Sequence, residues 1–164
     1  MSSIVVADAG PLHYLVLIDC ADILPALFER VLVPVAVRDE LIHQRAPQKV
    51  KGWILQPRPW LEVTPVAQTQ EVRGLHKGET EALQLALERR ASAVLMDDMD
   101  GRAAASRLGI PAIFTVAILE LAAEKNLIEL PTAIARLKGT SFFVSQEILD
   151  AALERDRQRR TQQK

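Results

Sequence analysis

With 164 residues, the chain is long enough to bury one core and short for several domains. Its composition, 49% hydrophobic and 25% charged, excludes an intrinsically disordered chain, and no apolar run reaches the ~20 residues that span a bilayer. A net charge of -1 excludes an overall attraction to nucleic acid, so such binding would need a local basic face. The one cysteine, Cys20, excludes an internal disulfide and a cysteine-rich zinc site, so we expect a cytoplasmic protein without membrane contact.

The first predicted strand, Ile4 to Ala7, is a continuous apolar run of the kind buried in a parallel sheet, and Asp8 follows it directly. Pro11 then opens an apolar helix that runs to about Ile18. A second apolar helix covers residues 21–28. The helices after Asp8 carry more apolar surface than a small monomer tolerates, which predicts a homodimer and a bound partner protein.

A strand over residues 31–33 ends at a proline, which opens a helix over residues 35–44. Glu40 lies at the edge of the apolar stripe of this helix. Spacing alone favours a solvated charge there, paired with Arg38 or His43. Only the other acids of the chain make Glu40 a candidate for the site.

Basic and aromatic side chains alternate with prolines over residues 46–59. The basic side chains suit phosphates, and Trp53 and Trp60 have faces on which unpaired bases stack. Trp53 with Ile54 and Leu55 is equally typical of an ordinary core. We give both interpretations the same weight.

The stretch from Gly78 to Asp100 predicts a helix, a buried strand and a group of carboxylates. Glu79 shares a helix face with Ala82, Leu83 and Ala86 and therefore leans towards the core, whereas Glu81 lines up with Gln84, Leu85 and Glu88. The apolar run 93–96 is the strand. Three acids follow it, at Asp97, Asp98 and Asp100.

The rest of the chain completes an alternating β/α pattern, with a short edge strand over 61–63 and a last strand over 111–114. The pattern predicts an α/β fold, a three-layer α/β/α sandwich around a mainly parallel sheet of about five strands. We expect one domain over residues 1–154 that ends with a short helix over 145–153. The polar, basic tail over 155–164 is expected to fray.

Acids that follow parallel strands meet at one edge of the sheet, where open α/β sheets bind ligands. The set here contains only oxygen donors, which suit Mg²⁺ or Mn²⁺, and the three histidines lack zinc spacing. Each acid alone is as easily a helix cap. The sequence lacks a P-loop, a dinucleotide-binding glycine motif and a serine nucleophile elbow.

The chain resembles PIN-domain proteins, in the branch similar to VapC-type toxin ribonucleases, over nearly its whole length. The resemblance is carried by VVADAGPL, VLVPVAVRDEL, LHKGETEALQLAL, VLMDDMDGRAAASRLGI and FFVSQEILDAAL. It implies a Mg²⁺- or Mn²⁺-dependent endoribonuclease, the toxin of a toxin–antitoxin pair, neutralised by a small antitoxin protein.

Carried over residue by residue, the resemblance assigns the catalytic acids to Asp8, Glu40, Glu79 and Asp98. The metal ligands among them are Asp8, Glu79 and Asp98, with Asp100 as an accessory position and Asp97 less certain. Many members have Ser or Thr beside the first Asp, where this chain has Ala9-Gly10, which weakens the surroundings of the metal. Toxin members also usually carry Asp where this chain has Glu79.

The substrate is expected to be RNA, contacted at its phosphates by basic side chains around the acids. These are Arg38, Arg45, Lys49, Lys51 and Arg102. Two alternatives stay open: a PIN-like module that mainly binds a partner protein, and a receiver-like domain that accepts a phosphoryl group on Asp. Against the receiver, the Asp pair follows a late strand instead of the first.

Overall fold

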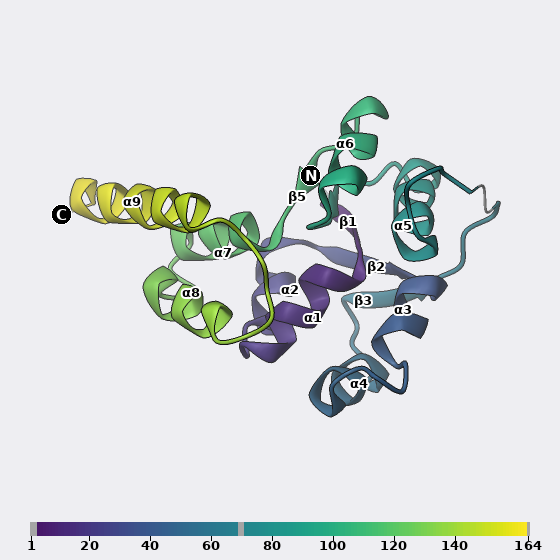
Figure 1. Ribbon diagram of the computed structural model, residues 1–164, viewed down its shortest axis with the longest axis horizontal. Helices are drawn as coiled ribbons and strands as arrows, with labels where there is room; N and C mark the ends of the chain where they lie inside the picture. Colours follow the sequence, from purple (N-terminus) through teal and green to yellow (C-terminus); the bar gives the residue numbers. More distant parts are fainter. Residues whose placement is uncertain (1–2, 69–70, 164) are drawn as a thin grey trace.

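The computed structural model describes residues 3–68 and 71–163 and places five strands in one sheet, all paired in parallel (Figure 1). The order across the sheet is β3-β2-β1-β4-β5. The strands are β1 (Ile4–Ala7), β2 (Arg30–Pro34), β3 (Leu61–Thr64), β4 (Ala93–Leu95) and β5 (Ala112–Ile113). The predicted α/β class and the parallel five-stranded sheet are confirmed.

Helices connect each strand to the next in the described part of the chain: three lie between β1 and β2, two between β2 and β3, and one in each of the other two connections. They are α1 (Ala9–Leu17), η1 (Ala21–Ile23), α2 (Leu24–Leu27), α3 (Val35–Leu41), α4 (Gln48–Leu55), α5 (Lys77–Glu88) and α6 (Met99–Arg107). After β5 follow α7 (Thr115–Glu124), α8 (Leu130–Lys138) and α9 (Gln146–Gln162).

The side chains of the strands alternate between two hydrophobic cores, one on each face of the sheet. Val5 and Ala7 of β1 pack into the larger core with α1, α3, α4, α7, α8 and α9. Val6, between them, packs into the smaller core with α5 and α6. Because both faces are covered, the central strands β1 and β4 are apolar throughout, as their sequences predicted. The three layers of the sandwich are therefore confirmed.

Strand β1 is the centre of the sheet and the point at which the strand order reverses. It pairs with β2 on one side and β4 on the other. In open parallel sheets the crevice outside the carboxyl ends at such a point binds ligands. The backbone N–H of Asp8 donates to the carbonyl of Leu95 at 2.9 Å, which keeps the ends of β1 and β4 together.

The end of the chain is more ordered than the sequence indicated. Helix α9 continues to Gln162, through the segment from Arg155 onward where the sequence analysis expected a frayed tail. The Arg155 side chain donates to both carboxylate oxygens of Glu120, at 2.8 and 3.1 Å. Asp156, only 2% exposed, is paired with two arginines one turn further on. The composition of the tail does not reveal these contacts, because one joins residues far apart in sequence and the others depend on the tail being helical.

The apolar helices after Asp8 do not expose the surface that the sequence analysis assigned to a partner. Leu12, Leu15 and Ile18 are buried, and so is Leu119 of α7. Their side chains fill the larger core, so this reason for a partner surface is wrong. Among the described residues no single helix is long and apolar enough to cross a membrane; the segments 9–17 and 21–27 pass such a test only as a pair bent by 118°.

Candidate active site

Asp8 is a buried acid at the centre of the site, only 5% exposed. It stands where β1 ends and α1 begins, as the N-cap residue of α1. Its Oδ1 is buried and has no hydrogen-bond partner in the described part of the chain. A buried carboxylate oxygen without a partner costs free energy unless a ligand satisfies it.

Glu40 and Gly78 come from different helices and meet beside Asp8. A Cβ added to Gly78 would overlap the Glu40 carboxylate and lie 3.5 Å from Asp8 Oδ1. The absence of a side chain at Gly78 therefore lets two carboxylates approach the start of α5. Glu40 stays partly open to solvent, with its side chain 43% exposed.

His76, the N-cap residue of α5, lies between two of the acids. Its Nε2 is 2.6 Å from Glu79 Oε1, and its Nδ1 is 3.6 Å from Glu40 Oε1. Sequence reasoning treated this histidine as an isolated structural residue. A signal was present in its spacing from Glu79, because residues i and i+3 face each other around a helix start. Glu40 pairs with neither Arg38 nor His43 in this structure.

The four acids Asp8, Glu40, Glu79 and Asp98, called the acid cluster from here on, influence one another electrostatically. The pKa of Asp8 is raised to about 7, mainly by burial and to a lesser degree by the charges of Glu40 and Glu79, while the Ala9 N–H and the charge of His76 oppose the rise. Burial also raises the pKa of Glu40. The pKa of Glu79 is raised by burial and by the charges of Asp98 and Glu40, while His76 opposes the shift. Like charges close together in a low dielectric cause such shifts.

The two aspartates after β4 have different roles. Asp97 accepts hydrogen bonds from the backbone N–H and the hydroxyl of Thr115, both at 2.7 Å. Asp98 is the N-cap residue of α6 and accepts the N–H of Gly101 through Oδ2 at 2.9 Å. Asp98 thus faces the acid cluster, whereas Asp97 fixes the start of α7.

Gly10 lies against Asp97, at the position where the sequence lacks the expected hydroxyl. A Cβ on Gly10 would lie 3.2 Å from Asp97 Oδ2. The glycine therefore leaves room for the bonds between Asp97 and Thr115. Burial raises the pKa of Asp97, while these bonds and the charge of Arg102 oppose the shift.

Two further acids of the sequence analysis are Asp100 on α6 and Glu81 on α5. Asp100 is exposed in the first turn of α6, and no hydrogen bond or ion pair joins it to the acid cluster among the described residues. Glu81 is buried, 5% exposed, and its Oε1 accepts the backbone N–H of Ala36 at 3.1 Å. Glu81 thereby ties α5 to the first turn of α3, the helix that carries Glu40. The sequence analysis placed Glu79 towards the core and made no such assignment for Glu81, but both side chains are buried.

Most of the basic side chains proposed for the substrate are engaged elsewhere. Lys49 is 2.6 Å from Asp19, which follows the far end of α1, ~13 Å along the helix from Asp8. Lys51 donates to the carbonyl of Gln44 at 3.0 Å. Arg38 is paired with Asp39, and Arg45 is exposed.

The tryptophans of the basic segment pack within the protein. The rings of Trp53 and Trp60 are 6.1 Å apart, and the Arg58 guanidinium lies 4.2 Å from the centre of the Trp53 ring. Both tryptophans contact the larger core. The structure thus favours the core interpretation over base stacking for this segment.

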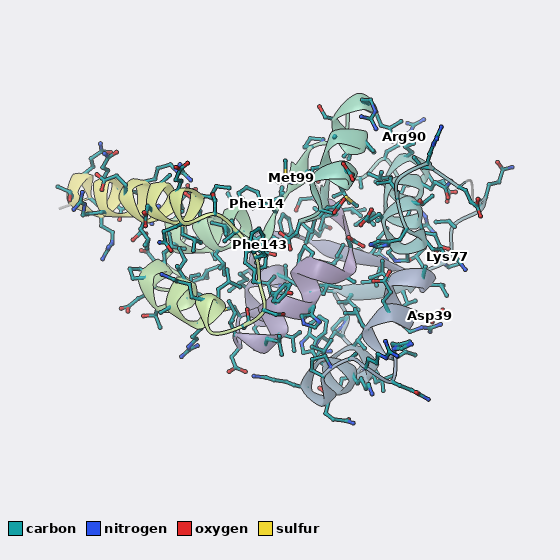
Figure 2. All side chains as sticks on the ribbon, in the orientation of Figure 1. Asp39, Lys77, Arg90, Met99, Phe114 and Phe143 are labelled. Carbon is teal, nitrogen blue, oxygen red and sulfur yellow. The ribbon has the colours of Figure 1, made fainter. Side chains whose placement is uncertain are left out.

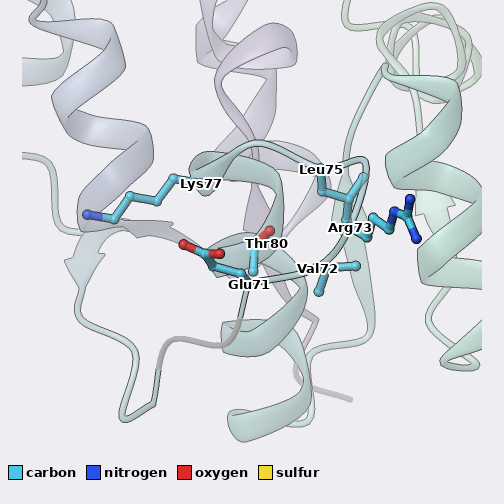
Figure 3. A pocket seen from close by; sticks show the side chains of 6 residues that line it. All are labelled: Glu71, Val72, Arg73, Leu75, Lys77 and Thr80. Carbon is cyan, nitrogen blue, oxygen red and sulfur yellow. The ribbon is translucent and has the colours of Figure 1, made fainter.

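Two pockets border α5 and α6. One, of about 600 Å³, contains Asp98, Met99, Arg102 and Phe114 in its lining. The other, of about 590 Å³, is lined by Glu71, Val72, Arg73, Leu75, Lys77 and Thr80 (Figure 3). The second lining contains none of the acid cluster.

The acid cluster offers the type of ligand atom that a hard divalent cation prefers. Its donors are carboxylate oxygens, and Asp8 Oδ1 lacks any other partner in the described residues. In the described ranges 3–68 and 71–163, however, no three His, Cys, Asp or Glu side chains are arranged to hold an ion as they stand. Binding would therefore require the carboxylates to turn towards Asp8.

Three comparisons with known proteins bear on this site. A family model described as "PIN domain" matches residues 4–158. A solved structure, a PilT N-terminus domain protein from the hyperthermophilic archaeon Sulfolobus solfataricus P2, is 14% identical, with a TM-score of 0.49 over 87% of this chain and 99% of that one. This similarity is too low to carry an argument. A search of curated proteins found no match.

Proposed function

Because the chain belongs to the PIN-domain family, we propose that it is a metal-dependent endoribonuclease. PIN domains are typically nucleases, and nucleases are hydrolases of phosphodiester bonds. The finer parts of the proposal, the metal and the RNA substrate, are argued from the acid cluster.

The observation that carries the proposal is the buried, unpartnered Oδ1 of Asp8 beside Glu40 and Glu79. Burying acids together raises their pKa values and costs stability. A protein that only needed a stable fold gains nothing from such a cluster. Perturbed acids in a crevice at the carboxyl ends of strands are typical of a catalytic site.

Asp8, Glu79 and Asp98 would hold Mg²⁺ or Mn²⁺, which supplies an activated water and stabilises charge on the departing oxygen when bound. Glu40, with His76 beside it, lies at the open side of the cluster and can take up a proton from water there. Gly78 keeps that side accessible.

The proposal includes a biological role. We propose a toxin that acts on RNA in the cytoplasm, is neutralised by a small antitoxin protein and forms a homodimer. The resemblance to VapC-type proteins supports this role. Light scattering at micromolar concentration tests the dimer, and a monomer there contradicts it.

Cleavage of labelled single-stranded RNA in Mg²⁺ or Mn²⁺ tests the enzyme activity. The wild type should cut, and EDTA should stop the reaction. Asp8→Asn should abolish cleavage without unfolding, because it removes a charge from a cluster of like charges. Asp39→Asn, at an exposed acid on α3, is the control and should cut normally. Cleavage that persists in EDTA or in Asp8→Asn would sink the proposal.

The alternatives are weaker. Membership of the PIN family favours a nuclease over the receiver-like domain. The perturbed acid cluster favours catalysis over a module that only binds a partner protein.

A further inference from the structure

The pocket beside the acid cluster shares a wall with it. Asp98 lines this pocket, and its charge raises the pKa of Glu79. The other walls come from α6, the start of α7 and the loop between α8 and α9. Figure 2 shows Met99, Phe114 and Phe143 near one another, and all three line the pocket. Asp98 therefore belongs to both the acid cluster and the pocket lining, so a molecule bound at the acid cluster lies next to the pocket.

Phe143 projects from this loop with 96% of its surface exposed, more than the other large apolar side chains described. Its neighbours are fixed. Phe142 packs edge to face against Tyr14, with ring centres 4.9 Å apart, and Tyr14 and Ser141 share a hydrogen bond of 3.1 Å. The N–H of Phe142 donates to Thr140 Oγ1 at 3.1 Å. The anchored loop presents the Phe143 ring to solvent, where a bare ring is unfavourable unless something covers it.

Arg102 adds a positive charge to the same pocket. Its guanidinium carbon is 4.9 Å from the centre of the Phe114 ring. Its Nε is buried without a hydrogen-bond partner in the described part of the chain. The pocket thus combines a cation that has hydrogen-bonding capacity left with aromatic faces, a combination that suits a phosphate followed by an unpaired base.

We propose that this pocket binds one unpaired nucleotide of the RNA next to the phosphate at the acid cluster. The base stacks on Phe143 and its phosphate contacts Arg102. This inference rests on the proposed ribonuclease function and names its subsite. An apolar peptide segment would cover Phe143 and Met99 but leave the positive charge of Arg102 unpaired, whereas the phosphate of a nucleotide pairs with it, so a nucleotide fits better.

The test is a titration of the full chain, in EDTA, with a short single-stranded RNA that carries 2-aminopurine, whose fluorescence falls when it stacks. Phe143→Leu should weaken binding by about 5- to 30-fold and abolish the quenching, since it keeps bulk but removes the ring. Phe143→Trp should retain both. Leu55→Ala is the matched control, because Leu55 is 64% exposed on α4 and far from the pocket lining.

Three results overturn the inference: RNA that does not bind, binding that Phe143→Leu leaves unchanged, or a Phe143→Leu change that weakens only a protein partner. The titration needs no catalysis, so its failure differs from a failure of the proposed function. If the wild type cleaves RNA and Phe143→Leu binds RNA with unchanged affinity and quenching, only the stacking site is disproved. If the RNA probe is quenched but the wild type cleaves no RNA, only the proposed enzyme activity is disproved.

Discussion

The Cα of Gly78 faces the carboxylate of Glu40 so closely that a methyl group there would overlap it. Gly78 lies in the first turn of α5, where Ala would otherwise favour the helix. The acid cluster thus depends on a missing side chain as much as on the acids themselves.

Gly78→Ala should lower cleavage by about 10- to 100-fold, because the added methyl group pushes the Glu40 carboxylate out of its place beside Asp8. Stability should change little, since the end of a flexible side chain can move. Gly52→Ala is the matched control, as a Cβ there meets nothing within 4 Å. It should stabilise α4 by ~0.5–1 kcal/mol and leave cleavage unchanged. Equal activity of both variants would contradict the role of Gly78.

The stability of the metal-free protein should depend on pH, because the pKa of Asp8 differs between the folded and unfolded states. The folded pKa of Asp8, about 7, exceeds its ordinary 3.8, so the folded state binds the proton more tightly than the unfolded state. This contribution is fully present below pH 4 and is lost as pH rises to 7. Its size is ~4 kcal/mol, from roughly 1.4 kcal/mol for each pKa unit.

Urea denaturation in EDTA at pH 5 and pH 8 measures this effect. Asp8→Asn should be more stable than the wild type at pH 8, with a smaller difference at pH 5. Asp39→Asn, at the exposed end of an ion pair, should show no such pH dependence. A wild-type protein that is as stable at pH 8 as at pH 5 relative to Asp8→Asn contradicts the raised pKa.

Divalent cations should reverse that loss. Mn²⁺ or Mg²⁺ that binds the folded acid cluster stabilises it by mass action, so the Tm of the wild type should rise with metal at pH 7.5. Asp8→Asn should not respond. A rise of equal size in both proteins would place the ion elsewhere.

The hydrogen bond from the Thr115 hydroxyl to Asp97 should stabilise the folded protein. Thr115→Val removes one of the two hydrogen bonds on a partly buried carboxylate and should destabilise the protein by ~1.5–3 kcal/mol in urea unfolding. Thr115→Ser keeps the hydroxyl and should recover most of the loss. A Thr115→Val protein that is as stable as the wild type would show that the hydroxyl bond to Asp97 contributes nothing.

RNA binding should depend on salt through Arg102 and hardly through Lys49. Each phosphate contact on a single strand contributes ~0.7 to the slope of log K against log salt. Arg102→Gln should lower the slope by about that amount. Lys49→Gln should not, because Lys49 is paired with Asp19 at the far end of α1. The opposite pattern would restore the basic segment as the substrate contact.

Local pattern was sufficient for much of this protein. Apolar runs and one short edge pattern predicted the five strands, and Asp8 and Asp98 follow two of them, β1 and β4, which are neighbours in the sheet. The family is confirmed by the match over residues 4–158. These features depend on residues that are neighbours in sequence, or on the parallel strand order that the alternating β/α pattern predicts. Both can be read from one sequence.

Only the tertiary structure decided which side chains face each other across elements. His76 reaches Glu40, and Glu81 reaches Ala36, across 36 and 45 residues of sequence. The packing of α7 assigned Asp97 to Thr115 and left Asp98 to the acid cluster. Helical periodicity tells which face of a helix is apolar, but the partner of a polar atom depends on how separate helices dock. That docking is fixed by the two cores as a whole.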